Sequence, residues 1–346
     1  MNERKWDLDL IRIIACVLVV IIHVAGYGME IMDPKTLNWQ IRNLVVCMAR
    51  CTVPMFFMLS GILFLNREIS IKKLYKKYIS HILAVWVVWS LFYACIDYIA
   101  YLNDGGNSIF FFAERFFLGH YHLWFLASLL AAYVSYPLLH EIVHVLDKTL
   151  VLYLGALTLF GLVLKETVDP FLTSSVWDDI WNDLAIPTGF VGIVYFVLGY
   201  YLYRKMELLT RKKCLLIYGS AVALIAGVNM VCSEVCGISL SVTYGYLNFG
   251  VLASAIALFL FLLQSFKGVI LSERKKIIVR EISECTLGIY LMHTFFIEQV
   301  FRRIGLVQDD FPTIIAIILF SVLAFIISLA FTWVIRKIPV CGKWLV

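Results

Sequence analysis

Long runs of apolar residues, separated by short polar segments, recur along the whole chain. A helix needs about 20 apolar residues to cross the hydrocarbon layer of a bilayer. Runs of roughly this length lie near residues 10–28, 44–65, 78–101, 122–140, 150–166, 187–203, 214–233, 246–264, 284–302 and 313–335. A β-barrel would instead show short segments in which apolar and polar residues alternate. The pattern predicts an all-α, polytopic membrane protein with about ten transmembrane helices.

The basic residues predict the orientation of these helices. Most of the 29 lysines and arginines lie in segments that share one side of the membrane when the predicted helices alternate in direction. Positively charged loops stay in the cytoplasm, so we expect both termini to be cytoplasmic. The first apolar run holds Arg12 and His23 and lacks a small-residue cleavage site, so we interpret it as a helix and not as a removable signal peptide.

Composition supports one membrane domain over residues 1–346. Of the chain, 62% is hydrophobic and only 15% is charged, and the mean hydropathy is +0.89. The net charge of +5 follows the predicted topology, so we expect the lipid bilayer and no nucleic acid as a partner. The nine cysteines form no C-x-x-C pair, and we expect free thiols that pack as small apolar groups, with no metal site and no bound cofactor.

Ionisable residues inside predicted spans are the candidates for chemistry, because a charge at membrane depth is costly and is usually kept for function. Arg12 and His23 are separated by ten apolar residues. Eleven helical steps end about 20° beyond three full turns, so both side chains project from one face, about 16 Å apart along the axis. A snorkelling arginine and a hydrogen-bonded core histidine would explain the pair without a function.

The second predicted helix adds polar groups at two depths. Because it runs in the opposite direction, Arg50 falls near the depth of His23, and Ser60 falls near that of Arg12. Pro54 removes a backbone hydrogen bond and predicts a kink that can open a cavity. Ser60 and Gly61 also permit close helix packing, which needs no function.

Two further groups stand at the ends and in the middle of later helices. Lys76, Lys77 and His81 form a basic collar in the inner loop and at the start of the third helix. The collar is either positive-inside charge alone or a seat for the phosphates of an acyl-CoA. His122 and Trp124 begin the fourth helix, and His293 lies in the middle of the ninth. The acidic segment around 167–186 contains Trp177 and Trp181; a solvated loop is the simpler interpretation, and a sugar-binding loop is the alternative.

In combination these segments resemble the acyltransferase-3 family of integral membrane acyltransferases, in particular its surface-polysaccharide O-acetyltransferase branch. The match rests on Arg12-x10-His23, on R-x-x-x-P-M-F-F-M-L-S-G from Arg50 to Gly61, on H-L-W-F-L from His122 and on L-G-I-Y-L-M-H ending at His293. It spreads over nearly the whole chain. One departure is that many members carry arginines at the base of the third helix, where this chain has Lys76, Lys77 and His81.

The resemblance implies a multi-pass enzyme of the bacterial plasma membrane. It would move an acyl group, usually acetyl, from cytoplasmic acyl-CoA (acetyl-CoA) to a hydroxyl of an extracytoplasmic acceptor such as a cell-surface glycan. His23 and Arg50 would be catalytic, while Arg12, Ser60, Lys76, Lys77 and His81 would bind the donor. His122, Trp124 and His293 would serve the acceptor or have secondary roles.

The chemistry of these residue types agrees with acyl transfer. An imidazole can act as general base near neutral pH, or can itself be acylated transiently. A guanidinium can stabilise the oxyanion formed at the thioester carbonyl. Two other classes remain open: a transporter of small molecules such as serine, similar to the membrane half of vancomycin-type serine racemases, and a non-catalytic envelope scaffold. The scaffold would not need an aligned arginine and histidine, and those racemases carry a soluble domain after the last helix.

Overall fold

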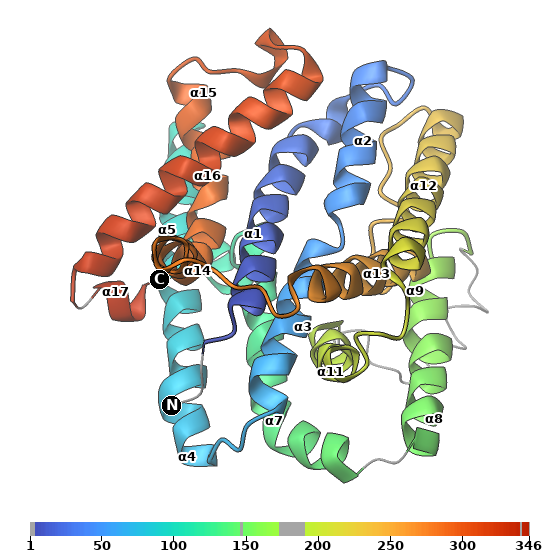
Figure 1. The fold of residues 1–346 in the computed structure, drawn as a ribbon. Coiled ribbons are helices and arrows are strands. Elements are labelled where there is room, and N and C mark those ends of the chain that lie inside the picture. The colour runs from blue at the N-terminus through green and yellow to red at the C-terminus, as the bar shows by residue number, and fades with distance from the viewer. Residues whose placement is uncertain (1–3, 146–147, 173–190, 340, 346) are drawn as a thin grey trace.

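The computed structural model describes residues 4–145, 148–172, 191–339 and 341–345, which form a bundle of helices (Figure 1). The main helices, in chain order, are α1 (Trp6–Gly26), α2 (Leu37–Ala49), α3 (Thr52–Leu65), α5 (Ser80–Asn103), α6 (Ile109–Leu118), α7 (Trp124–Val145), α8 (Lys148–Thr158), α11 (Val191–Arg204), α12 (Arg211–Cys236), α13 (Phe249–Phe266), α14 (Glu273–Phe295) and α16 (Thr313–Lys337). No β-strand occurs within the described ranges, which confirms the predicted all-α class.

Short helical segments extend or join these helices. They are η1 (Met29–Ile31), α4 (Ile71–Lys73), η2 (Leu74–Ile79), η3 (Tyr121–Leu123), η4 (Leu159–Leu164), α9 (Lys165–Val168), η6 (Phe296–Val300), α15 (Phe301–Arg303), η7 (Gln308–Asp310) and α17 (Cys341–Trp344). Three of them, η2, η4 and η6, are π-helical, a form that usually appears as single turns inside α-helices and often at functional sites.

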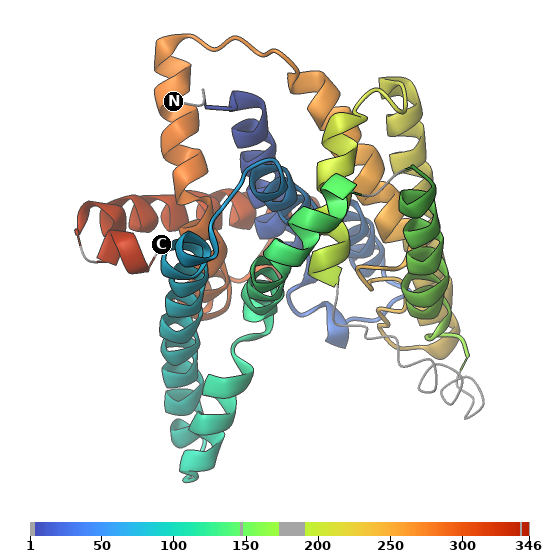
Figure 2. The ribbon, with the colours of Figure 1, turned by 90° about the horizontal axis from the view of Figure 1, so that it is seen from below.

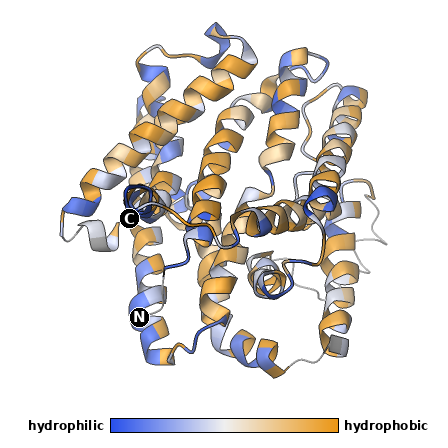
Figure 3. Ribbon diagram, viewed as in Figure 1, coloured by the Kyte–Doolittle hydropathy of each residue, from blue (hydrophilic) through white to orange (hydrophobic). Residues whose placement is uncertain are grey.

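Eight helical segments in the described part of the chain are long and apolar enough to cross a membrane. They are Trp6–Ile31, Leu37–Leu65, Ile71–Asn103, Ile109–Val145, Thr149–Val168, Arg211–Cys236, Phe249–Phe266 and Thr313–Lys337. The apolar helix α11 is shorter, and α14 begins with charged turns before its apolar half. Apolar residues dominate along most helices, as Figure 3 shows. Each predicted run therefore has a helical counterpart, and the protein is a polytopic membrane protein.

Several boundaries differ from the prediction. Helix α2 begins at Leu37, because the Thr36 hydroxyl accepts a hydrogen bond from the Trp39 N–H at 3.3 Å and caps the helix. Arg42, which precedes the predicted run 44–65, is consequently buried in α2. Helix α6 was not predicted. The Trp177 and Trp181 segment and the first residues of the predicted helix 187–203 lie outside the described residues.

Helix α1 occupies the middle of the bundle. It packs against α2, α3, α14 and α16, and Figure 1 shows it between α16 on one side and α2 on the other. Figure 2 shows the same bundle from below. The charged end of Arg42 covers the end of α1, where its guanidinium donates to the carbonyl oxygens of Val24 and Ala25. A cation at a helix C-terminus satisfies carbonyls that have no helical partner. The helix that carries Arg12 and His23 is thus held inside protein.

Helices α3 and α11 approach each other at two glycines. A Cβ atom at Gly61 would overlap the backbone carbonyl of Phe196, and one at Gly199 would overlap the backbone of Met58. Small residues allow such close backbone contact between membrane helices. The predicted packing role of Gly61 therefore has a specific partner, which is α11.

Candidate active site

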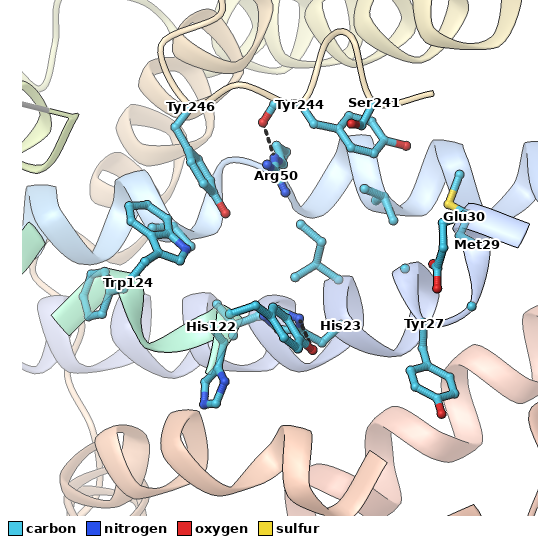
Figure 4. A pocket seen from close by; sticks show the side chains of 18 of the residues that line it. His23, Tyr27, Met29, Glu30, Arg50, His122, Trp124, Ser241, Tyr244 and Tyr246 are labelled. Carbon is cyan, nitrogen blue, oxygen red and sulfur yellow. Dashed lines mark hydrogen bonds between the residues drawn. The ribbon is translucent and has the colours of Figure 1, made fainter. Parts of the chain in front are cut away.

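A cavity of about 600 Å³ lies between α1, the junction of α2 and α3, the start of α7 and the connection 237–248. Figure 4 shows Arg50 on one side of this cavity and His23 and His122 on the other. Its polar and aromatic lining includes His23, Tyr27, Glu30, Arg50, Tyr121, His122, Trp124, Ser239, Ser241, Tyr244, Tyr246, Tyr290 and Glu298. We call it the outer cavity. It contains four of the predicted site residues: His23, Arg50, His122 and Trp124.

Three histidines from separate elements meet beside the outer cavity. The ring centroids of His23 and His293 are 4.9 Å apart, those of His122 and His293 5.7 Å, and those of His23 and His122 6.4 Å. His122 is buried, so it does not merely cap a helix at the membrane interface. The structure brings together residues that are far apart in the sequence.

His293 has a defined proton arrangement. Its Nδ1 lies 3.1 Å from the carbonyl oxygen of Ile289, and a carbonyl can only accept, so Nδ1 carries the proton. Its Nε2 is buried without a hydrogen-bond partner among the described residues. An unpartnered buried nitrogen is rare enough in proteins to require an explanation, and here the free lone pair belongs to a ring beside His23.

Tyr121 and Glu298 also belong to this site, although neither was among the predicted site residues. The Tyr121 hydroxyl donates to Glu298 Oε1 at 2.6 Å and lies 3.5 Å from His23 Nδ1. His120 Nε2 lies 3.3 Å from Glu298 Oε2. Glu298 occupies the π-helical segment η6. A carboxylate inside the predicted span 284–302 was a signal that sequence reasoning could have used.

A second set of hydrogen bonds fixes His122. The Tyr290 hydroxyl donates to its backbone carbonyl, and Thr294 Oγ1 lies 3.5 Å from its ring nitrogens. Tyr93 holds this part of α14 through a 2.7 Å hydrogen bond to the carbonyl of Leu291. Before η3, Gly119 adopts a φ of 71° that favours glycine. These contacts determine how the 3₁₀ segment η3 presents His122.

Arg50 lies between the last residue of α2, Ala49, and the first residue of α3, Thr52. Pro54 has no N–H, so the carbonyl of Arg50 lacks its helical donor and the helix is interrupted there. The Arg50 Nε–H donates to the carbonyl of Tyr244 at 2.5 Å. The guanidinium carbon lies 4.3 Å from the ring centroid of Tyr246 and 5.3 Å from that of Tyr244. No carboxylate in the described ranges forms an ion pair with it.

Arg12 lines a second, mainly apolar cavity of about 210 Å³ together with Ser60 and Tyr133, which we call the middle cavity. Its guanidinium donates to Asp9 Oδ1 at 3.0 Å and to Ser283 Oγ at 3.1 Å. Asp9 also pairs with Arg4 at 2.5 Å. Asp9, a buried carboxylate three residues before Arg12, was not among the predicted site residues.

A third cavity, of about 510 Å³, lies next to the middle cavity, and we call it the inner cavity. It shares Arg12 and Leu63 with the middle cavity. Four residues line both the middle and the outer cavity: Val19, Val53, Phe125 and Tyr290. Four cationic side chains and one amide line the inner cavity, which are those of Arg4, Lys5, Arg12, Arg67 and Asn66. The three cavities are therefore neighbours along α1.

The predicted donor residues before the third helix lie elsewhere. Lys76 and Lys77 are exposed in η2, and His81 is half-buried at the start of α5. None of the three lines the inner, middle or outer cavity. Of the predicted donor residues, the structure brings together only Arg12 and Ser60.

A polytopic helical protein with histidines and arginines around neighbouring cavities fits the class of integral membrane enzymes. The family model of the acyltransferase-3 type, described as an acyltransferase domain, matches residues 5–335. The chain therefore belongs to this family and is an acyltransferase of the membrane. No curated protein and no solved structure matches the chain.

Proposed function

We propose that this protein is an O-acetyltransferase that moves the acetyl group of cytoplasmic acetyl-CoA to a hydroxyl of an extracytoplasmic acceptor, a cell-surface glycan. The observation that carries the proposal is the series of three cavities along α1, with Arg12 between the inner and middle cavities and His23 in the outer one. An enzyme that joins substrates from opposite sides of a membrane needs such a series.

The inner cavity suits the phosphates of the donor. Arginine and lysine bind phosphate through charge-assisted hydrogen bonds, and Arg4, Lys5, Arg12 and Arg67 face this space with one lining carboxylate, Asp9. The pantetheine arm would then follow the mainly apolar middle cavity past Ser60. We assign a different role to Lys76, Lys77 and His81: they form a basic surface that attracts the polyanionic donor before it binds.

The outer cavity suits a carbohydrate. Sugars bind by stacking on aromatic rings and by hydrogen bonds from their hydroxyls, and this cavity supplies Tyr27, Trp124 and Tyr246 for stacking and Glu30 and Ser241 as polar partners. Wide polar and aromatic sites of this kind fix a ligand by a few placed groups. The acceptor hydroxyl would approach the thioester beside His23.

The residues support direct transfer. His23 takes the proton of the acceptor hydroxyl while the hydroxyl oxygen bonds to the thioester carbonyl carbon. The carbonyl oxygen becomes an oxyanion that Arg50 stabilises. When the C–S bond breaks, His23 returns the proton to the departing thiolate, so that the products are the acetyl ester and CoA. Tyr121 and Glu298 keep the His23 ring in position through the Tyr121 hydroxyl.

The test compares envelope glycans of cells with and without the protein by mass spectrometry. We expect a mass difference of one acetyl group per modified sugar, which mild alkaline hydrolysis of esters removes. Proteoliposomes test from which side of the membrane the donor is used: acetyl-CoA supplied only on the side of the basic loops should support transfer. If the glycans are identical and the proteoliposomes instead accumulate labelled serine, the protein is a carrier and the proposal is wrong.

A further inference from the structure

A buried polar network joins α2, α12 and the connection 237–248 beside the outer cavity. Asn43 is its centre. The Asn43 Oδ1 accepts from Asn229 Nδ2 at 3.0 Å and from the Tyr244 hydroxyl at 2.8 Å, and its Nδ2 donates to the carbonyl of Ala226 at 2.9 Å. Asn43 and Asn229 are 2% and 0% exposed. Burying two amides is costly unless they are hydrogen-bonded. Both polar atoms of Asn43 and the Asn229 Nδ2 are bonded, whereas the Asn229 Oδ1 has no partner among the described residues. The bonds that form tie the three elements together.

The network fixes the connection 237–248, which has no helical structure of its own. Asn229 Nδ2 also donates to the carbonyl of Leu240 at 3.0 Å. The Thr243 hydroxyl donates to the carbonyl of Ile225 at 2.9 Å. The Tyr195 hydroxyl donates to the carbonyl of Tyr246 at 2.5 Å. The segment that forms one wall of the outer cavity is therefore bonded along its length.

Tyr244 connects this network to Arg50. Its hydroxyl is bonded to Asn43, while its backbone carbonyl accepts the Arg50 Nε–H and its ring lies beside the guanidinium. Burial raises the pKa of the Tyr244 hydroxyl above its ordinary value, which keeps it protonated and able to donate. Since both ends of Tyr244 are bonded, the carbonyl that orients Arg50 has little freedom to move.

We propose that Asn43 and Tyr244 are positioning residues, which hold the Arg50 guanidinium in the orientation that the acyl-transfer step requires. The proposal rests on the proposed function of Arg50 as the group that stabilises the oxyanion. A preorganised donor is effective because it does not have to reorient during the reaction, and small displacements of reacting groups reduce rates strongly. The bond to Nε leaves the terminal amino groups of Arg50 available to the outer cavity.

The test uses Tyr244→Phe, which removes only the hydroxyl. The matched control is Tyr218→Phe, because the Tyr218 hydroxyl also binds α2, at the carbonyl of Met48 (2.9 Å), but is not bonded to Arg50 or Asn43. The purified full-length protein in lipid nanodiscs is assayed for CoA release from acetyl-CoA, with water as the probe acceptor. We expect kcat to fall roughly tenfold in Tyr244→Phe, with an unchanged KM for acetyl-CoA, and to stay unchanged in the control.

A double-mutant cycle shows whether Tyr244 acts through Arg50. Arg50→Lys keeps the charge but loses the Nε–H, so Tyr244→Phe should change kcat by less than about twofold in that background. If the two substitutions reduce kcat independently and their factors multiply, the inference is overturned. If Tyr244→Phe raises KM and leaves kcat unchanged, it is overturned as well.

A second measurement does not depend on activity. The ¹⁵N–¹H resonance of the Arg50 Nε–H is assigned by its absence in Arg50→Lys, and its exchange with solvent is measured. We expect faster exchange in Tyr244→Phe and no change in Tyr218→Phe. Equal exchange in the wild-type protein and both tyrosine variants would refute the positioning role. Altered exchange in a protein that shows no acetyl-CoA turnover would leave this role intact and refute the proposed function instead.

Discussion

His23 lies in the outer cavity where two histidine rings and a tyrosine hydroxyl converge on it. We predict that His23→Ala lowers kcat for acyl transfer by about 10²–10⁴-fold, the range that general acid–base groups contribute. The purified variant should retain the wild-type melting temperature. The matched control is His140→Ala, because His140 pairs with Glu141 on α7 and lines none of the three cavities. Wild-type turnover in His23→Ala would reduce His23 to a packing residue.

Glu298 extends the interactions of His23 through Tyr121. Glu298→Gln keeps the size of the side chain and removes the charge that Tyr121 and His120 contact. We predict a fall in kcat of roughly tenfold with little change in the KM for acetyl-CoA, because Glu298 lines the outer cavity and not the inner one. Glu141→Gln, at an exposed glutamate of α7, is the control. A Glu298→Gln variant that changed only donor KM would contradict this assignment.

At the residue scale, sequence could predict positions on one helix but not partners across helices. The spacing of Arg12 and His23 follows from helical geometry alone, and the structure places both beside neighbouring cavities. Asp9 and Glu298 were missed because their importance arises from contacts with Arg12 and Tyr121. The roles assigned to Arg50 and His23 are still predictions.

At the element scale, the contact between α3 and α11 makes a test of stability. We predict that Gly61→Ala lowers the melting temperature by several degrees or prevents folding, since an added methyl group would meet the backbone of Phe196, which cannot turn away. Gly219→Ala in α12 is the control, because a Cβ atom added there would meet nothing within 4 Å, and alanine is the better helix former. Equal stability of the two variants would show that the helices separate easily at this contact.

The helices themselves were largely predictable, because a membrane span needs an apolar run of defined length. Their ends were less so. Helix α2 begins several residues earlier than predicted through the Thr36 cap, and Arg42 is accepted in the interior because the end of α1 offers it carbonyl oxygens. The polar first half of α14 shows that helicity continues beyond the apolar run. The hydropathy profile of the sequence contains no signal for any of these features.

At the scale of the whole molecule, the series of cavities predicts that donor and acceptor sites respond separately to substitution. Arg12→Ala should weaken acetyl-CoA binding by roughly tenfold, because a lost charge-assisted hydrogen bond to phosphate is worth about 1.5–3 kcal/mol. Calorimetry on the protein in nanodiscs measures this affinity. Lys212→Ala, which removes an exposed charge at the start of α12, should leave it unchanged. An Arg12→Ala variant with wild-type affinity would mean that the phosphates bind elsewhere.

The glycine contact between α3 and α11 also restricts how the molecule can move. A carrier delivers its cargo by rocking one bundle of helices against another around a fixed site, so it requires an interface along which backbones slide. Here the backbones of the two helices interlock at Gly61 and Gly199, and α3 also carries Val53, a shared wall of the outer and middle cavities. The two helices thus form one closely packed unit beside the site. Substrates would then reach each other through narrow passages between fixed walls, without a rotation of one bundle of helices against another.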